Sequence, residues 1–143
     1  MSSTATAAAP LRCGDAITQN TTLTADLGQC TGNGLVVKAN GITLNLNRYT
    51  ITGNNRSAET VGVLLDNVTG VTVRNGTVTG FDAGINIDGG SGNTITAITA
   101  RDNINDNIKS AKAANECTYG DGITATGSDG NTISANRVIH NGP

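Results

Sequence analysis

The chain has very little of the bulky side-chain material that most small proteins pack into their cores. Among its 143 residues there is no tryptophan, one phenylalanine and two tyrosines. Charged residues are also scarce, at 14%, which argues against disorder because disordered chains are usually rich in charge. Glycine is abundant instead, with 19 residues, and Val, Ile and Thr recur at regular places. This composition predicts one domain of many short strands joined by tight turns.

Further absences exclude whole classes of function. The formal net charge is −2 and no basic patch is present, so nucleic-acid binding through phosphate contacts is not expected. No apolar run approaches the length of a membrane span. One histidine and three scattered cysteines have no metal-ligand spacing, so we expect neither a metal site nor a cofactor.

The N-terminal segment MSSTATAAAP has no hydrophobic signal core. Its alanine-rich end is similar to the small-residue tail of a secretory signal behind an added start methionine, and the alternative is an ordinary tag or tail. Under either interpretation residues 1–12 are predicted to be disordered.

A repeated phrase accounts for most of the remaining sequence. Alignment on a glycine followed by an apolar residue gives four lines, which begin at Gly34, Gly62, Gly84 and Gly122 with spacings of 28, 22 and 38 residues. Periods of this size point to a solenoid. If the shortest spacing is the unit, the first line carries a short insertion near residues 54–60 and the third a longer one at 104–120.

Stacking the lines produces columns of apolar residues. Within each line apolar and polar residues alternate, as on a half-buried strand. No single line can bury its interior, but lines stacked ~4.8 Å apart can, as coils of a parallel β-helix. The inward columns are Leu35, Val63, Ile85 and Ile123; Val37, Leu65, Ile87 and Ala125; Leu44, Val73, Ile95 and Ile133; and Ile51, Val78, Ala100 and Val138.

A family resemblance strengthens this prediction. The stretch CGDAITQNTTLTADLGQC, followed by GLVVKANGITLNLNRYTITG, resembles the start of secreted bacterial right-handed parallel β-helix repeat proteins of the pectate-lyase-like superfamily. The resemblance covers residues 13–143. It implies an all-β, right-handed parallel β-helix of about four coils at 34–143, with a loop insertion at 104–120, behind an N-terminal cap at 13–33. A cap also makes physical sense, because the end of such a stack is an exposed sheet edge over an open core.

We expect the three cysteines to differ in their bonding state. Cys13 and Cys30 bracket the predicted cap, and a disulfide between them would stabilise a small segment in an oxidising compartment. The alternative is two buried free thiols. Cys117 has no partner left in the chain, so it pairs with a cysteine elsewhere or stays free.

The resemblance also implies chemistry on polysaccharides. Many β-helix lyases, hydrolases and epimerases bind a sugar chain along the stacked coils, and they use an Asp/Glu pair or a base beside a uronate carboxyl. The candidate catalytic residues are Arg101, Asp102, Asp121, Arg137 and His140, with Lys109, Lys112 and Tyr119 on the inserted loop. The Asp-pair and Gly-His-Gly motifs of pectin hydrolases, the Asp-Pro-His-Asp motif of alginate epimerases and the calcium-binding aspartates of pectate lyases are missing. Exposed charges on turns without a functional role therefore stay an open alternative.

Outward side chains form a ladder of hydroxyl groups. Its members are Thr43, Thr72, Thr94 and Thr132. Regular threonine spacing is also used by ice-binding solenoids, but Asn45 and Arg74 interrupt the next row. The alternative is that threonine simply suits an exposed strand.

The last line suggests a further surface. The sequence stops where the next Gly-apolar line would begin, so we expect an uncapped coil. Self-association end to end through Ala125, Ile133 and Val138 is the simplest hypothesis, as a two-fold dimer or an open filament.

These patterns together predict a secreted structural or carbohydrate-associating module, part of a larger polysaccharide-active protein. The alternatives are a polysaccharide lyase, hydrolase or epimerase, and a self-assembling extracellular scaffold. The expected partners are a polysaccharide and further copies of the chain.

Overall fold

A computed structural model describes residues 10–55, 59–104 and 120–142, and every regular element among them is a β-strand. The predicted disordered tail (1–12) and inserted loop (104–120) fall largely outside these residues, as does Cys117. The strands are β1 (Asp15–Ile17), β2 (Thr21–Thr22), β3 (Leu27–Cys30), β4 (Leu35–Val37), β5 (Thr43–Asn45), β6 (Thr50–Gly53), β7 (Val61–Asp66), β8 (Thr72–Thr79), β9 (Ala83–Asp88), β10 (Thr94–Arg101), β11 (Asp121–Thr126), β12 (Thr132–Ser134) and β13 (Arg137–Ile139).

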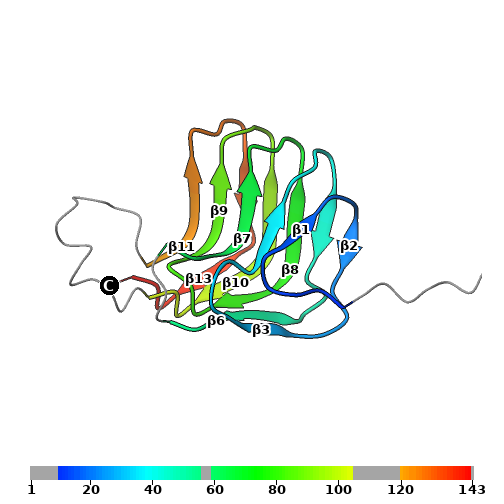
Figure 1. The fold of residues 1–143 in the computed structure, drawn as a ribbon. Helices are drawn as coiled ribbons and strands as arrows, with labels where there is room; N and C mark the ends of the chain where they lie inside the picture. Colours follow the sequence, from blue (N-terminus) through cyan, green and yellow to red (C-terminus); the bar gives the residue numbers. More distant parts are fainter. Residues whose placement is uncertain (1–9, 56–58, 105–119, 143) are drawn as a thin grey trace, which may run out of the picture.

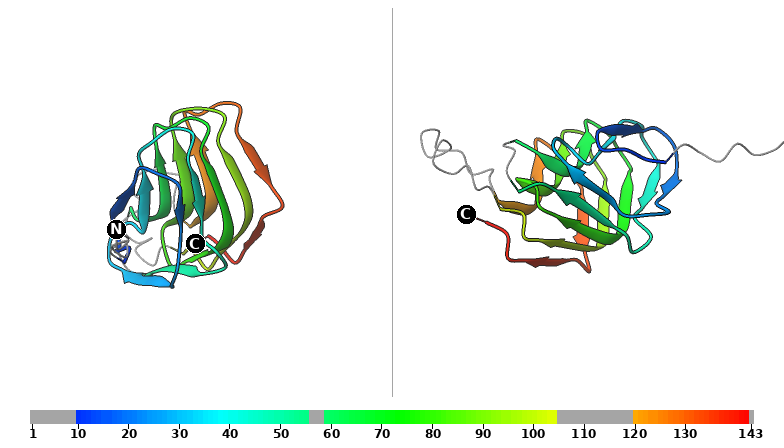
Figure 2. Two further views of the ribbon diagram at one scale, coloured as in Figure 1. Left: turned by 90° about the vertical axis from the view of Figure 1, so that its right-hand side faces the viewer. Right: turned by 60° about the horizontal axis from the view of Figure 1, so that its bottom comes forward.

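The strands form two sheets in which neighbouring strands run parallel. One sheet has five strands in the order β1-β4-β7-β9-β11. The other has eight, with β12-β10-β8-β5-β2 as its main path, and β13, β6 and β3 pair beside it. Figure 1 shows β1 and β2 at one end of the molecule and β11 at the opposite end. Figure 2 shows strands of successive repeats lying one behind the other.

The four inward columns predicted from the sequence are confirmed as registered neighbours. In the five-stranded sheet Leu35 lies opposite Val63, Val63 opposite Ile85, and Ile85 opposite Ile123. The other three columns follow the same order of strands. The column residues on strands β4 to β10 are fully buried and form the core between the sheets. Alternation within each strand therefore set which residues face inward.

Close backbone approach explains the glycine that starts each line. At Gly62 an added Cβ would collide with a Val78 side-chain carbon and lie 2.6 Å from the carbonyl oxygen of Gly84. Gly34, Gly84 and Gly122 have similarly close neighbours in the next repeat or across the core. A side chain in this column would push neighbouring repeats apart.

Asparagine side chains join successive repeats at the corners. Asn103 is fully buried. Its Oδ1 accepts a hydrogen bond from the Phe81 N–H at 3.2 Å, and its Nδ2 donates to the Val78 carbonyl at 3.2 Å and to Asn141 Oδ1 at 2.9 Å. Asn93 plays a similar part, because it accepts from the Val71 N–H at 2.9 Å. These bonds satisfy backbone groups that would otherwise be buried without partners.

Two further asparagines at corners, Asn75 and Asn136, have different contacts. The side chain of Asn75 donates to Asn45 Oδ1 at 3.4 Å, so two asparagines do bond to each other there. Asn136 instead bonds to the backbone of the preceding repeat, accepting from the Ile98 N–H and donating to the Ile95 carbonyl, both at 2.9 Å.

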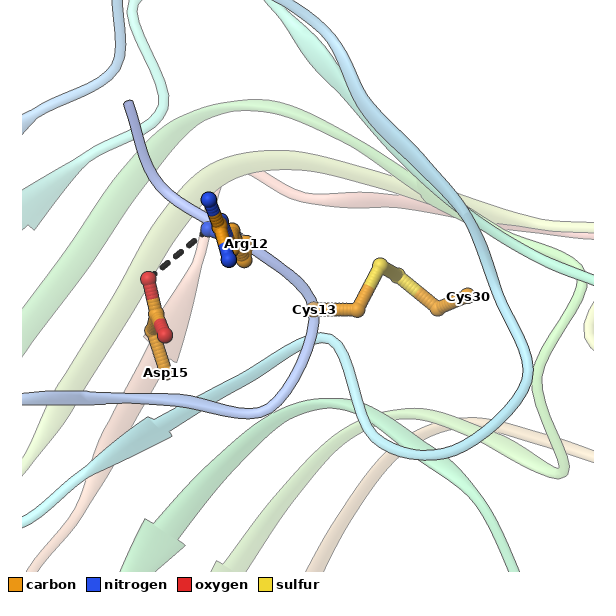
Figure 3. Close-up of a disulfide and its surroundings, with 4 residues drawn as sticks. All are labelled: Arg12, Cys13, Asp15 and Cys30. Carbon is orange, nitrogen blue, oxygen red and sulfur yellow. Dashed lines mark hydrogen bonds between the residues drawn. A yellow bond between two sulfur atoms is a disulfide. The ribbon is translucent and has the colours of Figure 1, made fainter. Parts of the chain in front are cut away.

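The segment predicted to cap the first coil contributes strands of its own. β1, β2 and β3 pair with β4, β5 and β6, so they are the outermost strands at that end. Cys13 and Cys30 form a disulfide with Cα atoms 5.5 Å apart, which ties the start of this segment to the end of β3 (Figure 3). The Arg12 N–H donates to Asp15 Oδ2 at 2.7 Å beside the bridge.

Candidate functional site

Three of the five candidate catalytic residues meet at one corner. Arg101 ends β10, Asp102 follows it, and His140 follows β13 on the neighbouring repeat. The strands bring them together because Arg101 lies opposite Ile139, and the Asp102 N–H donates to the Ile139 carbonyl at 3.3 Å. Asp102 and His140 both have positive φ, at 53° and 51°, so this corner turns sharply in both repeats.

Asp102 is the centre of this group. Arg101 Nη1 donates to Asp102 Oδ2 at 2.7 Å, a charge-assisted hydrogen bond. His140 Nδ1 lies 3.8 Å from Asp102 Oδ1, which is too long for a hydrogen bond but close enough for an ion pair when the imidazole is protonated. The group therefore has a carboxylate between two cationic or basic side chains.

Exposure limits what this group does chemically. The side chains of Arg101, Asp102 and His140 are 47%, 37% and 81% exposed. Water at such a surface weakens each charge interaction and leaves the histidine unconstrained. In an active site a general base is held in position by its neighbours. The described residues therefore offer a proton acceptor beside a carboxylate, with all three side chains open to water.

Arg137 and Asp121 lie apart from these three residues. Arg137 begins β13 opposite Thr99, two residues before the position that faces Arg101. Asp121 begins β11 in the other sheet, where its N–H donates to the Asp82 carbonyl at 3.0 Å. Burial raises the pKa of Asp121. Within the described ranges, no side-chain hydrogen bond or ion pair joins either residue to the Arg101 corner. The predicted loop residues Lys109, Lys112 and Tyr119 lie outside those ranges.

Asp82 is the buried acidic residue of the described chain, and it was not among the candidates expected from the sequence. Asp82 is 4% exposed and sits at the corner before β9. Burial raises its pKa most, and the charge of Glu59 raises it further, whereas backbone hydrogen bonds from Glu59 and Thr60 oppose the shift. The carbonyl of Asp82 accepts from the Gly120 N–H at 2.8 Å. Asp82 thus anchors the return of the chain into β11, a structural role.

One signal in the sequence points to Asp82. It stands two residues before the glycine of its line, Gly84, at a corner where the chain bends into the next strand. Asn33 stands directly before the glycine of the first line, and its Oδ1 accepts from the Val61 N–H at 2.8 Å. An Asx residue at this corner serves to bond the neighbouring backbone.

The outward threonine ladder is a set of registered neighbours across four strands. Thr43 lies opposite Thr72, Thr72 opposite Thr94, and Thr94 opposite Thr132. The first three are half-buried and Thr132 is exposed. A second outward column, Thr50, Thr77 and Thr99, continues into Arg137. The first ladder therefore presents four hydroxyl groups in a row without an intervening charge.

A hollow of about 650 Å³ lies at the end of the molecule that β1 and β2 form. Ile17, Leu23 and Leu27 contribute to its floor, and polar residues such as Gln19 and Asn20 border it. The Arg101 corner is not part of its lining.

The described residues contain neither a cluster of metal-ligating side chains nor a membrane-spanning helix. No three His, Cys, Asp or Glu side chains within it lie close enough together to hold a metal ion. A helix long and apolar enough to cross a membrane is also missing from the described residues.

The chain was compared with protein-family models, with curated proteins and with solved structures, and none of them matches it.

Proposed function

We propose that this protein is an extracellular carbohydrate-associating module built as a right-handed parallel β-helix of the pectate-lyase-like kind. The fold proposal is supported by registered columns that run through successive repeats in both parallel sheets. Parallel connections of this type are right-handed in nearly all proteins. The Cys13–Cys30 disulfide supports an extracellular location, because such bonds persist in oxidising compartments.

The threonine ladder is the observation that carries the proposed function. Four hydroxyl groups on paired strands repeat at the ~4.8 Å strand spacing. A polysaccharide also presents hydroxyl groups at regular intervals, and each threonine hydroxyl both donates and accepts a hydrogen bond. An uncharged row favours a neutral or weakly charged glycan.

Aromatic stacking has no part in this proposal. Phe81 is 1% exposed, and Tyr49 packs partly buried against the core. Among the described residues, binding must therefore come from many hydrogen bonds, each contributing about 0.5–1.5 kcal/mol net. We expect weak affinity for short oligosaccharides and stronger retention by long polymers that contact several repeats.

Affinity electrophoresis in gels that contain soluble polysaccharides tests this function. The double variant Thr72→Val/Thr94→Val removes two neighbouring hydroxyls but keeps the side-chain shape, and we expect binding about tenfold weaker. The matched control is Thr77→Val/Thr99→Val, which changes two registered threonines of the same two strands outside the ladder. Equal retention of both double variants would show that the ladder does not bind the polymer.

A polysaccharide lyase, hydrolase or epimerase is the second candidate, favoured by the meeting of Arg101, Asp102 and His140. The assay is release of unsaturated or reducing-end products, or epimerisation, from uronate-containing and neutral glycans. If the corner is catalytic, Arg101→Ala and His140→Ala each lower the rate of any activity found. Activity that neither substitution changes would exclude this site.

A further inference from the structure

One charged side chain lies among hydroxyl and amide groups on the outer side of the eight-stranded sheet. β8 is the central strand of the path β12-β10-β8-β5-β2. Val73 on this strand is completely buried, so its neighbours Thr72 and Arg74 face outward, and Arg74 is exposed. Thr72 belongs to the threonine ladder, and Arg74 belongs to the next outward row, about 6.6 Å further along the strand.

This next row, which we call the arginine row, runs beside the threonine ladder across the same four strands. Its members lie opposite one another on β5, β8, β10 and β12, and they are Asn45, Arg74, Thr96 and Ser134. The two rows have four positions each, and Arg74 is the single charge among them. No carboxylate stands in either row, so none of these side chains neutralises the guanidinium.

The side chain of Arg74 has no partner among the described residues. The acids in their ion pairs are Asp66 and Asp102, and neither is paired with Arg74. The amide beside Arg74 is already occupied, because Asn45 Oδ1 accepts from the Asn47 N–H at 2.8 Å and from Asn75 Nδ2 at 3.4 Å. The guanidinium therefore keeps its five N–H donors for water or a bound molecule.

From this arrangement we propose that Arg74 recognises an anionic group on the polymer that the threonine ladder binds, and that this polymer is a mostly neutral glycan with sparse acidic substituents. The inference rests on the proposed binding along the ladder and adds the charge pattern of the ligand. A polymer seated on Thr72 passes within reach of the long Arg74 side chain. A guanidinium matches a carboxylate or a phosphate group, which it binds through two parallel hydrogen bonds.

Two observations favour sparse charges over a densely charged polymer. Because the two rows hold one cation, most acidic groups of a polyanion would lie against uncharged side chains. An anion that loses water there without meeting an opposite charge is destabilised. The chain also has a formal net charge of −2, which opposes the approach of a polyanion. A glycan with occasional acidic groups avoids both effects and can place one such group at Arg74.

Biolayer interferometry of the full chain on immobilised polysaccharides tests this assignment. The probes are cellulose, dextran and galactomannan, each in a neutral hydroxyethylated, a lightly carboxymethylated, a lightly phosphorylated and a densely carboxymethylated form. We expect a lightly charged form to bind about three- to fivefold more tightly than the neutral form of the same backbone, the range typical of one exposed charge pair. This preference should vanish in about 1 M NaCl, where the Debye length is about 3 Å. The carboxymethylated and phosphorylated forms show which anion is preferred.

Three variants separate Arg74 from the overall charge of the chain. Arg74→Gln is expected to bring the ratio of charged to neutral binding down to about one. Arg74→Lys keeps the charge but not the planar fork, so it should retain part of the preference. The matched control is Lys38→Gln, which removes one positive charge beside the five-stranded sheet, where Lys38 Nζ lies 3.9 Å from Asp66 Oδ2. This control should keep the full preference, and circular dichroism shows whether each variant is folded.

The outcomes distinguish this inference from the proposed function. Equal binding of neutral and lightly charged forms would overturn the inference and leave glycan binding standing. A preference that Arg74→Gln keeps, or that Lys38→Gln loses to the same extent, would also overturn it. Tighter binding of the densely carboxymethylated forms would reject the sparse pattern. Failure to bind any form of any backbone would reject the proposed function and, with it, the inference that rests on it.

Discussion

Ile95 and Ile133 allow the stacking of the repeats to be tested with one substitution in two places. They are the same residue type, they occupy the same inward column, and they lie directly opposite each other on β10 and β12. Ile95 is completely buried, whereas Ile133 is 48% exposed. Replacing each with alanine removes the same atoms from two surroundings that differ only in the cover from a further repeat.

The expected losses of stability follow from this difference. The substitution deletes about three carbon groups, each contributing roughly 0.8 kcal/mol when buried. At Ile95 the lost transfer energy and the remaining cavity should together lower the free energy of unfolding by about 3–4 kcal/mol. At Ile133 half of the transfer energy is missing and the space is open to water, so the loss should be about 1 kcal/mol.

Urea unfolding followed by circular dichroism measures both losses. The protein concentration should be low enough that the chain is monomeric, so that only contacts within one chain are compared. Unchanged m-values would show that both variants expose the same amount of surface when they unfold. Equal losses at the two positions would refute the reasoning, since they would mean that Ile133 is covered as well as Ile95 within one chain.

Three further predictions concern the ends and the corners. Replacing Cys13 and Cys30 with serine should lower the free energy of unfolding by about 3 kcal/mol by the loop-closure estimate, measured in urea; no change would mean that the first segment unfolds separately. Because burial raises the pKa of Asp82, its protonated form stabilises the fold below the ordinary aspartate pKa, and this contribution is lost as pH rises through the raised value. Asp82→Asn should therefore gain melting temperature relative to the natural chain as pH rises, and parallel pH profiles would contradict this. Gly62→Ala should lose about 1–3 kcal/mol through crowding, whereas Gly32→Ala, which has open space around it, should be neutral in thermal melts.

The column structure was predictable because it depends on local rules. A strand alternates its side chains, and each line begins at a glycine, so aligning the glycines also aligns Leu35 with Val63 and Ile85. The two insertions did not disturb the alignment, because both fall between strands, after β6 and after β10. The cysteine pair could be named for a similar reason, since Cys13 and Cys30 bracket one short segment.

The candidate site was harder to predict because it depends on corners. The spacing of Arg101, Asp102 and His140 along two repeats brought them together, as their positions in the lines suggested. Asp121 is not part of this corner, because it stands directly before the aligned Gly122 and therefore begins β11 in the other sheet. There its N–H donates to the Asp82 carbonyl, a contact that the alignment does not show.

The sequence by itself determined which residues face the core and which strands lie side by side, because side-chain alternation and a repeated glycine are local properties of the chain. Only the tertiary structure decided how exposed each column member is and which corner side chains touch. Ile95 and Ile133 look equivalent as letters, yet one is buried and the other half exposed. Asp82 and Asn103 look like ordinary turn residues, yet both are buried. The physical reason is that burial depends on what covers a residue from the neighbouring repeat, and no residue carries that information in its own line.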